Sequence, residues 1–302
     1  DLFLEQLVQG QDGQLLYLAD GEWLATRQRR ETFRIKGGDP VIEIIHETRN
    51  GPLLNGALGQ PKHMLQPLAA RSAYGLAYRS IQNETDNSVD AFFALSRARS
   101  TSEAAQASLG VRAMALNMIY ADAANIGWQV TGRYPERRRG RGQLPSPGWD
   151  SDYAWLGYVD PTRHPNIHNP RDGWLGTANH RSVAADHPVR LSSSWYYPER
   201  YERLADLLSG RMHDGDSMTA MQYDQTSPFV AKLRAMLQAS DLTLALEQAI
   251  IALPAADQPR AREALQRLLT FDGNLSADSA DAALYAAFLH ESARQIFLDE
   301  LG

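Results

Sequence analysis

The 302-residue sequence predicts an α+β protein in which strands come first along the chain and helices come last. Short apolar runs, separated by turns that contain Asp-Gly or Gly-Gly, fill the first sixty residues and are typical of β-hairpins. Beyond Pro198, apolar residues recur every three or four positions, which is the spacing of an amphipathic helix. Because the two patterns are segregated rather than alternating, they favour α+β over a parallel α/β sheet. We therefore expect a β-rich part over residues 1–197 and a mainly helical part over residues 198–302.

Three hairpins are predicted from the turn residues that lie between apolar runs. Glycine and aspartate tolerate the positive φ angles that tight hairpin turns require. Asp20-Gly21 and Gly37-Gly38 are such turns, and residues 122–125 supply a third. The predicted strand pairs are residues 15–18 with 23–26, residues 32–35 with 41–45, and residues 116–120 with 126–130.

Residues 133–172 are predicted to form a long loop, because six prolines interrupt them. The loop contains the basic run 137–141, and such a run either binds a polyanion or lies on a solvated surface. Aromatic residues do not alternate with these arginines, as they do in nucleic-acid-binding segments. We therefore favour the solvated surface.

Three helices are predicted in the second part of the chain. Each shows apolar residues on one face, and the first is followed by Gly210, a residue that commonly ends a helix. Asp257 is expected to cap the second helix with its side chain. The predicted helices cover residues 201–208, residues 261–269, and a last segment from residue 283 to residue 297.

Composition excludes several classes of function. The net charge of −6 argues against a nucleic-acid partner, and no apolar run is long enough to cross a membrane. Cysteine is absent, which excludes disulfides, thiol nucleophiles and cysteine-ligated zinc. A histidine zinc site is disfavoured, because Pro165 separates His164 from His168. The common nucleotide-binding and serine-hydrolase motifs are also missing.

The most informative segment covers residues 169–181 and is predicted to contain a turn, a short strand and then Asn179 among polar neighbours. An asparagine in this position has two interpretations. It either turns or caps the chain, or its side-chain amide donates a hydrogen bond to developing negative charge, as in an oxyanion hole. The segment alone favours the turn.

Motifs along nearly the whole chain resemble those of the penicillin acylases and acyl-homoserine-lactone acylases, which are N-terminal-nucleophile hydrolases. Asn169-Pro170-x-x-Gly173-Trp174-x-x-Thr177-Ala178-Asn179 is similar to a motif of their β chain. Further similar segments occur in the same order: residues 33–38 (F-R-I-K-G-G), 48–52 (T-R-N-G-P, with Asn50 where the family usually has His), 120–127 (Y-A-D-A-A-N-I-G), 132–135 (G-R-Y-P), 195–200 (W-Y-Y-P-E-R), 221–224 (M-Q-Y-D) and 271–273 (F-D-G).

The resemblance implies part of the four-layer αββα fold of these hydrolases. In the family, a Ser, Thr or Cys at a newly exposed N-terminus attacks the amide carbonyl and its own α-amine serves as base. This chain begins with Asp1, so the resemblance places the nucleophile upstream, in another part of the precursor. Asn179 matches the family's oxyanion-hole asparagine. Arg200 matches an arginine that organises the site through its fixed fork of donors.

The resemblance also implies a structural calcium ion, which several family members bind through acidic side chains and a backbone carbonyl. Asp1 and the carbonyl oxygen of Pro135 correspond to two of those ligands, and Asp186 is the nearest candidate for a further acidic ligand. Oxygen ligands of this kind suit calcium. The resemblance further implies export to the periplasm.

We therefore expect a piece of an amidohydrolase that cleaves an acyl amide bond, such as that of a penicillin or an N-acyl homoserine lactone. Its partners are expected to be the small-molecule substrate and the remainder of its own precursor, namely the α chain and the N-terminal part of the β chain. The alternative is a non-catalytic relative that uses the same fold to bind an acylated ligand or a protein. An unrelated α+β module is a third, weaker interpretation.

Overall fold

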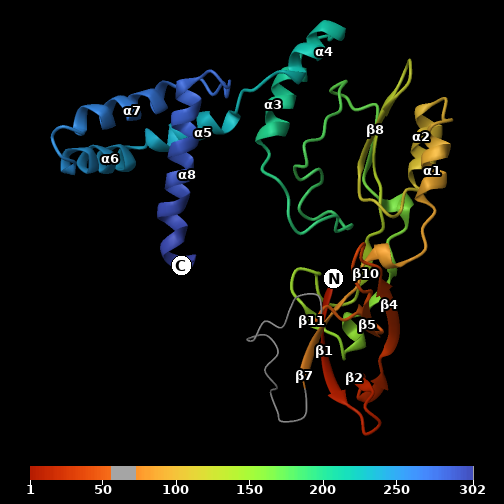
Figure 1. The fold of residues 1–302 in the computed structure, drawn as a ribbon. Coiled ribbons are helices and arrows are strands. Elements are labelled where there is room, and N and C mark those ends of the chain that lie inside the picture. Colours follow the sequence, from red (N-terminus) through yellow and green to blue (C-terminus); the bar gives the residue numbers. More distant parts are fainter. Residues whose placement is uncertain (56–72, 302) are drawn as a thin grey trace. The chain divides into compact units, whose positions relative to one another are not determined.

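The computed structural model describes residues 1–55 and 73–301 (Figure 1). The chain forms two compact units, and each unit is made from two separate stretches of sequence. The described strands all lie in the first unit together with two short α-helices, whereas the second unit contains six described helices. The predicted α+β class is thus confirmed. The first unit comprises residues 1–170 and 183–194, and the second comprises residues 171–182 and 195–302.

A five-stranded sheet forms the base of the first unit. Its strands are β1 (Leu2–Gln9), β2 (Leu15–Ala19), β3 (Glu22–Ala25), β7 (Ala73–Tyr78) and β11 (Ser146–Pro147). β7 pairs antiparallel with one edge of β1, while β11 and β2 share the other edge. Alternate residues of β1 are buried, as expected for a strand with one face on a core. Phe3, Glu5 and Leu7 lie on this buried face.

The three predicted hairpins are confirmed. β2 and β3 pair antiparallel across Asp20-Gly21, and both of these residues have the positive φ that the turn requires. The second hairpin joins β4 and β5 and is extended by the short β6, whereas the third joins β8 and β9 and is extended by β13. Their bounds are Arg27–Phe33 (β4), Val41–Thr48 (β5), Gly51–Pro52 (β6), Asn117–Ala121 (β8), Ile126–Val130 (β9) and Asn166–His168 (β13).

Two α-helices that the sequence analysis does not predict pack beside the third hairpin. They are α1 (Ser88–Leu95) and α2 (Thr101–Ser108), and α2 contacts both strands of the hairpin (Figure 1). α2 begins with a signal that is visible in the sequence, because the hydroxyl of Ser100 accepts a hydrogen bond from the backbone N–H of Glu103. A serine followed three residues later by glutamate is typical of helix starts.

Residues 133–172, predicted to form a long loop, contain short regular elements instead. The prolines there separate short strands and single helical turns instead of preventing them. β10 pairs antiparallel with β12, and this pair carries a register shift between Glu136 and Arg137. The elements are β10 (Pro135–Arg137), β11, the 3-10 helices η2 (Ser151–Tyr153) and η3 (Pro161–Arg163), β12 (Trp155–Tyr158) and β13; a further 3-10 helix, η1 (Ile81–Asn83), precedes α1.

The second unit is helical and confirms the three helices predicted there. Its core is formed by Val230, Leu237, Leu268, Phe271, Ala282 and Tyr285, with Phe271 and Tyr285 in a tilted aromatic contact. Asp257 stands at the N-cap of α7 but makes no cap hydrogen bond with its side chain, contrary to the prediction. The six helices are α3 (Glu199–Leu208), α4 (Gly215–Gln222), α5 (Pro228–Leu237), α6 (Ser240–Ala252), α7 (Gln258–Thr270) and α8 (Ala280–Leu301).

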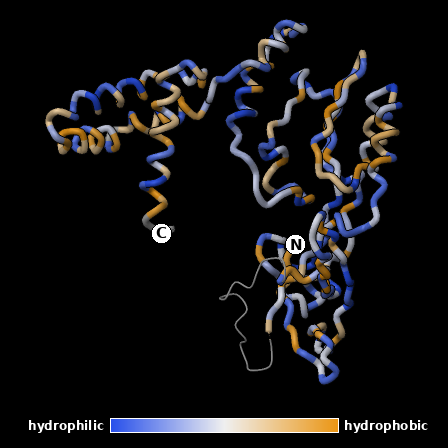
Figure 2. Tube along the Cα trace, in the orientation of Figure 1, coloured by the Kyte–Doolittle hydropathy of each residue, from blue (hydrophilic) through white to orange (hydrophobic). Residues whose placement is uncertain are grey.

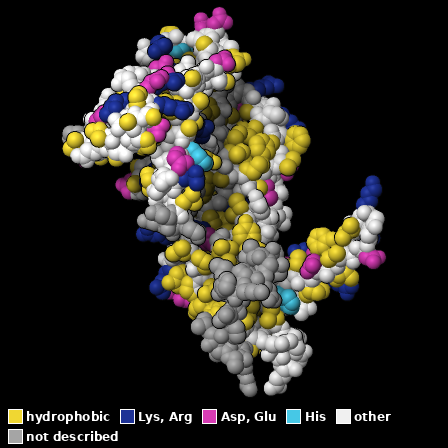
Figure 3. Space-filling view, turned by 60° about the vertical axis from the view of Figure 1, so that its left-hand side comes forward, with side chains coloured by type: hydrophobic (Ala, Val, Ile, Leu, Met, Phe, Trp, Pro, Cys, Tyr) yellow, Lys and Arg dark blue, Asp and Glu magenta, His cyan; other side chains and the backbone are white. Residues whose placement is uncertain are grey.

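Large apolar side chains are exposed on both units. Figure 2 shows that α6 is more hydrophobic than its neighbour α7, and Figure 3 shows many hydrophobic side chains on the surface. Exposed members include Phe33, Ile42 and Ile44 on the second hairpin, Leu244 and Ile251 on α6, and Ile296 and Phe297 near the end of α8. Exposed apolar side chains that gather on one element in this way are typical of contact with other protein segments. Among the described residues, the helices are too short or too polar to span a membrane.

Candidate functional site

Asn179 lies in an irregular segment of the second unit. Residues 174–178 form no strand, so the short strand predicted before Asn179 is absent from this described segment. The segment was expected in the β-rich part over residues 1–197, whereas residues 171–182 pack with the helices. Asn179 adopts a left-handed backbone conformation with φ of 58°, a region that asparagine tolerates better than most residues. The turn interpretation of Asn179 is therefore confirmed, and the turn leaves its side chain exposed at the surface.

Arg200 fixes the orientation of the Asn179 amide. It is the second residue of α3, and its Nη2 donates to the side-chain Oδ1 of Asn179 at 2.8 Å and to the backbone oxygen of Ala178 at 2.6 Å. Because the guanidinium occupies the oxygen of the amide, the amide nitrogen points the other way. The backbone N–H of Tyr196 donates to the backbone oxygen of Asn179 at 3.2 Å, which adds a second contact that holds the segment in place. The structure thus brings together the two residues that the sequence places 21 positions apart.

A stack of rings supports the same segment. The centroid of the His180 imidazole lies 3.7 Å from that of the Tyr201 ring, and the two planes are nearly parallel. The Trp174 ring also contacts Tyr201, with the two centroids 6.0 Å apart. Tyr201 follows Arg200 on α3, so the stack and the guanidinium hold neighbouring points of the segment against one helix. Burial lowers the pKa of His180, which keeps the ring neutral near pH 7.

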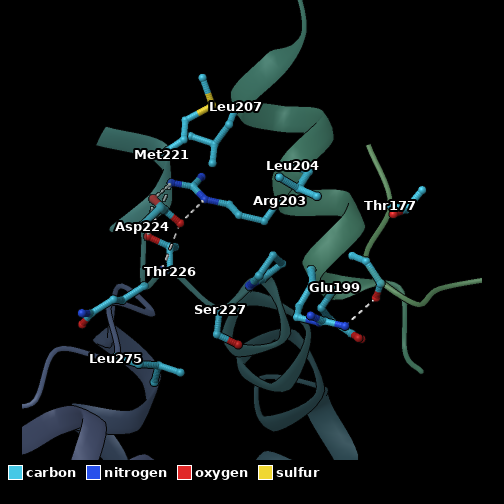
Figure 4. A pocket seen from close by; sticks show the side chains of 14 residues that line it. Thr177, Glu199, Arg203, Leu204, Leu207, Met221, Asp224, Thr226, Ser227 and Leu275 are labelled. Atoms are coloured by element: carbon cyan, nitrogen blue, oxygen red, sulfur yellow. Dashed lines mark hydrogen bonds and ion pairs between the residues drawn. The ribbon is translucent and has the colours of Figure 1, made fainter. Parts of the chain in front are cut away.

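A cavity of about 460 Å³ adjoins the backbone of Ala178 and the side chain of Arg200 (Figure 4). Its wall includes a bidentate ion pair in which Arg203 donates to the two carboxylate oxygens of Asp224 at 2.9 and 2.6 Å. This pair joins α3 to the turn after α4 and lowers the pKa of Asp224, chiefly through the hydrogen bonds from Arg203. Asp224 ends the M-Q-Y-D segment, so this motif serves to position α3.

The residues expected to bind calcium lie in the first unit, and their contacts do not fit a calcium site. Both carboxylate oxygens of Asp1 accept hydrogen bonds from Arg137, at 2.8 Å and 2.7 Å, and the indole N–H of Trp155 donates to Oδ2 at 2.7 Å. The carbonyl oxygen of Pro135 also accepts from Arg137, at 3.2 Å. Asp186 is exposed. Within the described ranges, no group of three acidic or histidine side chains is arranged to hold a metal ion.

A buried carboxylate that no motif of the sequence marks lies beneath the T-R-N-G-P segment. Glu5 is fully buried, and its Oε1 accepts from the hydroxyl of Thr48 at 2.8 Å and from the amide nitrogen of Asn50 at 3.0 Å. The same amide nitrogen donates to the backbone oxygen of Gly148 at 3.1 Å. Asn50 therefore joins three parts of the first unit. An acidic residue at an inward position of an alternating strand is the signal that would have revealed Glu5.

Comparison with known proteins identifies the class to which this fold and site belong. The fold is shared with a solved structure, thermostable penicillin G acylase from Alcaligenes faecalis, with a TM-score of 0.65 at 21% identity over 92% of this chain and 47% of that one. This likeness confirms the predicted N-terminal-nucleophile hydrolase fold. The family model for penicillin amidase matches residues 1–302, and the chain belongs to that family.

Several relatives are similar along the whole chain. Acyl-homoserine lactone acylase QuiP of Pseudomonas aeruginosa is 61% identical over all of this chain, and its counterpart in Pseudomonas syringae pv. syringae is 51% identical. Penicillin acylase 2 proenzyme of Pseudomonas sp. (strain SE83) is 32% identical over 95% of this chain. The chain spans only about a third of the length of these relatives, namely 36%, 35% and 34%.

Proposed function

We propose that this chain is part of an amidohydrolase that cleaves the acyl amide bond of an N-acyl homoserine lactone. Hydrolysis of linear amide bonds is the activity that the relatives' names share, and the relatives with identities of 61% and 51% are named for the homoserine-lactone substrates. The observation that carries the proposal is the Arg200–Asn179 contact, which occupies the amide oxygen of an exposed asparagine and leaves its nitrogen available as a donor.

In the proposed mechanism, Asn179 donates a hydrogen bond to the oxyanion that forms when a nucleophile attacks the amide carbonyl. A fixed donor stabilises this charge in the transition state more than it stabilises the neutral carbonyl of the substrate. Arg200 is the positioning residue, because its contact with Asn179 prevents the amide from rotating. The nucleophile, its base and the remaining oxyanion donor belong, on this proposal, to other parts of the longer protein.

The exposed apolar surfaces on β4–β5 and α6 support the proposal that other parts of the precursor pack against this chain. Export to the periplasm goes with this proposal, and a signal segment in the longer gene is its test.

The test is a pair of substitutions in the complete protein, with release of the acyl chain as the readout. Asn179→Asp keeps the shape and the oxygen that Arg200 binds, but it replaces the amide donor by a carboxylate oxygen. Asn179→Ala removes both groups. We expect each variant to stay folded and to lower kcat by about 10²–10³-fold, the range found when one oxyanion donor is removed.

Asn87→Ala is the matched control, because Asn87 is an exposed asparagine whose side chain makes no cap hydrogen bond at the start of α1. It should leave kcat unchanged. Turnover like that of the wild type in Asn179→Asp refutes the role of Asn179. A wild-type protein that binds acylated ligands without releasing the acyl chain identifies the non-catalytic alternative.

A further inference from the structure

We propose that the guanidinium of Arg137 holds the corner formed by Asp1 and Pro135 in place of a calcium ion, so that this part of the fold is independent of calcium. The resemblance of this chain to the penicillin acylases points to calcium at the same two residues. The donor set around them is that of a charge-assisted hydrogen-bond cluster. This inference concerns the first unit and does not depend on the proposed role of Asn179.

The side chain of Arg137 uses all three of its nitrogens at this corner. Nε and Nη2 form a fork on the Asp1 carboxylate at 2.7 and 2.8 Å, and Nη1 donates to the carbonyl oxygen of Pro135 at 3.2 Å. Planar two-point pairing of this kind is the strongest arrangement available to an arginine and a carboxylate. The Arg137 side chain therefore forms hydrogen bonds with both the Asp1 carboxylate and the Pro135 carbonyl, the two groups expected to bind calcium.

The fold of the surrounding strands aims Arg137 at Asp1. The register of β10 and β12 shifts between Glu136 and Arg137, so that Arg137 stands opposite Trp155. A shift of register re-aims the side chains that follow it. Trp155 then donates its indole N–H to the same carboxylate at 2.7 Å, which makes three donors to one acid. The pairing of β10 with β12 therefore places Arg137 next to Asp1, although the two residues are 136 positions apart.

The corner offers little space for a divalent cation, and a cation there would meet the charged guanidinium of Arg137. The side chains of Arg137 and Asp1 are only 15% and 9% exposed. Gly142 approaches so closely, with φ of +69°, that a Cβ there would lie 2.5 Å from Asp1 Oδ1. A second guanidinium, that of Arg79, lies 4.8 Å above the Trp155 ring. The Arg137 guanidinium already occupies both oxygens of the Asp1 carboxylate, whereas calcium requires six to eight oxygen ligands.

Displacement of Arg137 by calcium is also unfavourable. A calcium ion on the Asp1 carboxylate would leave the Arg137 guanidinium largely buried and without its counterion. Removal of one partner from a buried ion pair is strongly destabilising, because the remaining charge is uncompensated. The geometry therefore predicts that added calcium does not compete for this carboxylate.

The test uses the complete protein and compares thermal unfolding in millimolar calcium with unfolding in excess EGTA. Asp1→Asn weakens the fork, and we expect it to lower the melting temperature by at least about 5 °C, by the same amount in both media. Any calcium bound elsewhere in the longer protein shifts wild type and variant equally. A difference between the two media that is present in wild type and lost in Asp1→Asn overturns the proposal.

Arg137→Met is expected to lower the melting temperature to a similar degree, whereas Arg138→Met is the matched control. Arg138 is the next residue, its side chain is 62% exposed, and it pairs with Asp152 at the surface, so its loss should shift the melting temperature by less than about 2 °C. A fall in Arg138→Met as large as that in Arg137→Met refutes the special role of Arg137.

A second measurement does not require a variant at Asp1 to fold. Terbium is a luminescent substitute for calcium, and excitation of a nearby tryptophan sensitises its emission. Trp155 touches the Asp1 carboxylate, so an ion bound there would be sensitised by this indole. We expect the terbium emission of the wild-type protein and of Trp155→Phe to be equal. A signal that Trp155→Phe abolishes places an ion at Asp1 and refutes the proposal.

Discussion

Replacement of Arg200 by lysine tests whether Arg200 acts through Asn179. Lysine keeps the positive charge but lacks the planar fork whose Nη2 contacts both Asn179 Oδ1 and the Ala178 oxygen. Hydrogen bonds to a charged group contribute about 1.5–3 kcal/mol, and the exposure of Arg200 favours the lower end. A loss of about 1.5 kcal/mol of transition-state stabilisation corresponds to a fall in kcat of about 10-fold.

The assay is a double-mutant cycle on the complete protein, with kcat for an N-acyl homoserine lactone as the measured quantity. In wild-type background, Arg200→Lys should lower kcat by about 10-fold. In the Asn179→Ala background, the same change should lower kcat by less than about 2-fold, because no amide remains to be oriented. Residues in direct contact commonly show coupling energies of about 0.5–3 kcal/mol, which this cycle would detect.

Arg203→Lys is the matched control for this cycle. Arg203 lies one turn further along α3 and pairs with Asp224 rather than with Asn179. Its replacement should change kcat by the same factor whether or not the Asn179 amide is present. A 10-fold loss on Arg200→Lys that persists in full in the Asn179→Ala background would falsify the positioning role.

Three further predictions concern the stability of the two units, each measured by urea unfolding of the purified protein. Gly148→Ala should destabilise by about 1–3 kcal/mol, because its Cβ would overlap the buried Glu5 carboxylate, whereas Gly215→Ala at the open start of α4 should not. Burial lowers the pKa of His164, so stability should fall as the pH drops below about 6.5, and His164→Phe should reduce this dependence to the part contributed by His180, whose pKa burial also lowers. Phe271→Ala should cost about 3–5 kcal/mol because the side chain is 4% exposed in the helical core, and an effect below 1 kcal/mol would contradict that placement.

Hairpins and amphipathic helices are predictable from this sequence because their signals are local. Asp20-Gly21 favours a tight turn between β2 and β3 through its own backbone preferences. The apolar spacing in α3 and α7 requires only that one face of each helix be buried. α1 and α2 are harder to predict, since eight residues give only two turns of periodic pattern. The short strands among the prolines are harder still, because their partners lie elsewhere in the chain.

The candidate site shows the same division between local and distant signals. Asn179 and Arg200 are identified by matching known motifs, but their contact depends on a left-handed turn and on the rotation of α3, which no spacing rule specifies. The basic run 137–141 is predicted to be solvated, and this holds for Arg138 but not for Arg137. The difference arises from the register shift in β10, which composition cannot reveal.

Arg200 and Arg137 each donate hydrogen bonds to a side-chain oxygen, but the consequences differ. At Arg200 the guanidinium binds the oxygen of a neutral amide, and the amide gains a fixed direction while its nitrogen stays available. At Arg137 the guanidinium binds a carboxylate that the Trp155 indole also contacts, so three of about four acceptor positions are occupied and little capacity is left for another ligand. Nearly complete hydrogen bonding stabilises a fold, whereas an exposed donor that is held in a fixed direction can serve a reaction. This contrast in hydrogen-bond satisfaction is why we assign chemistry to Asn179 and a structural role to Asp1.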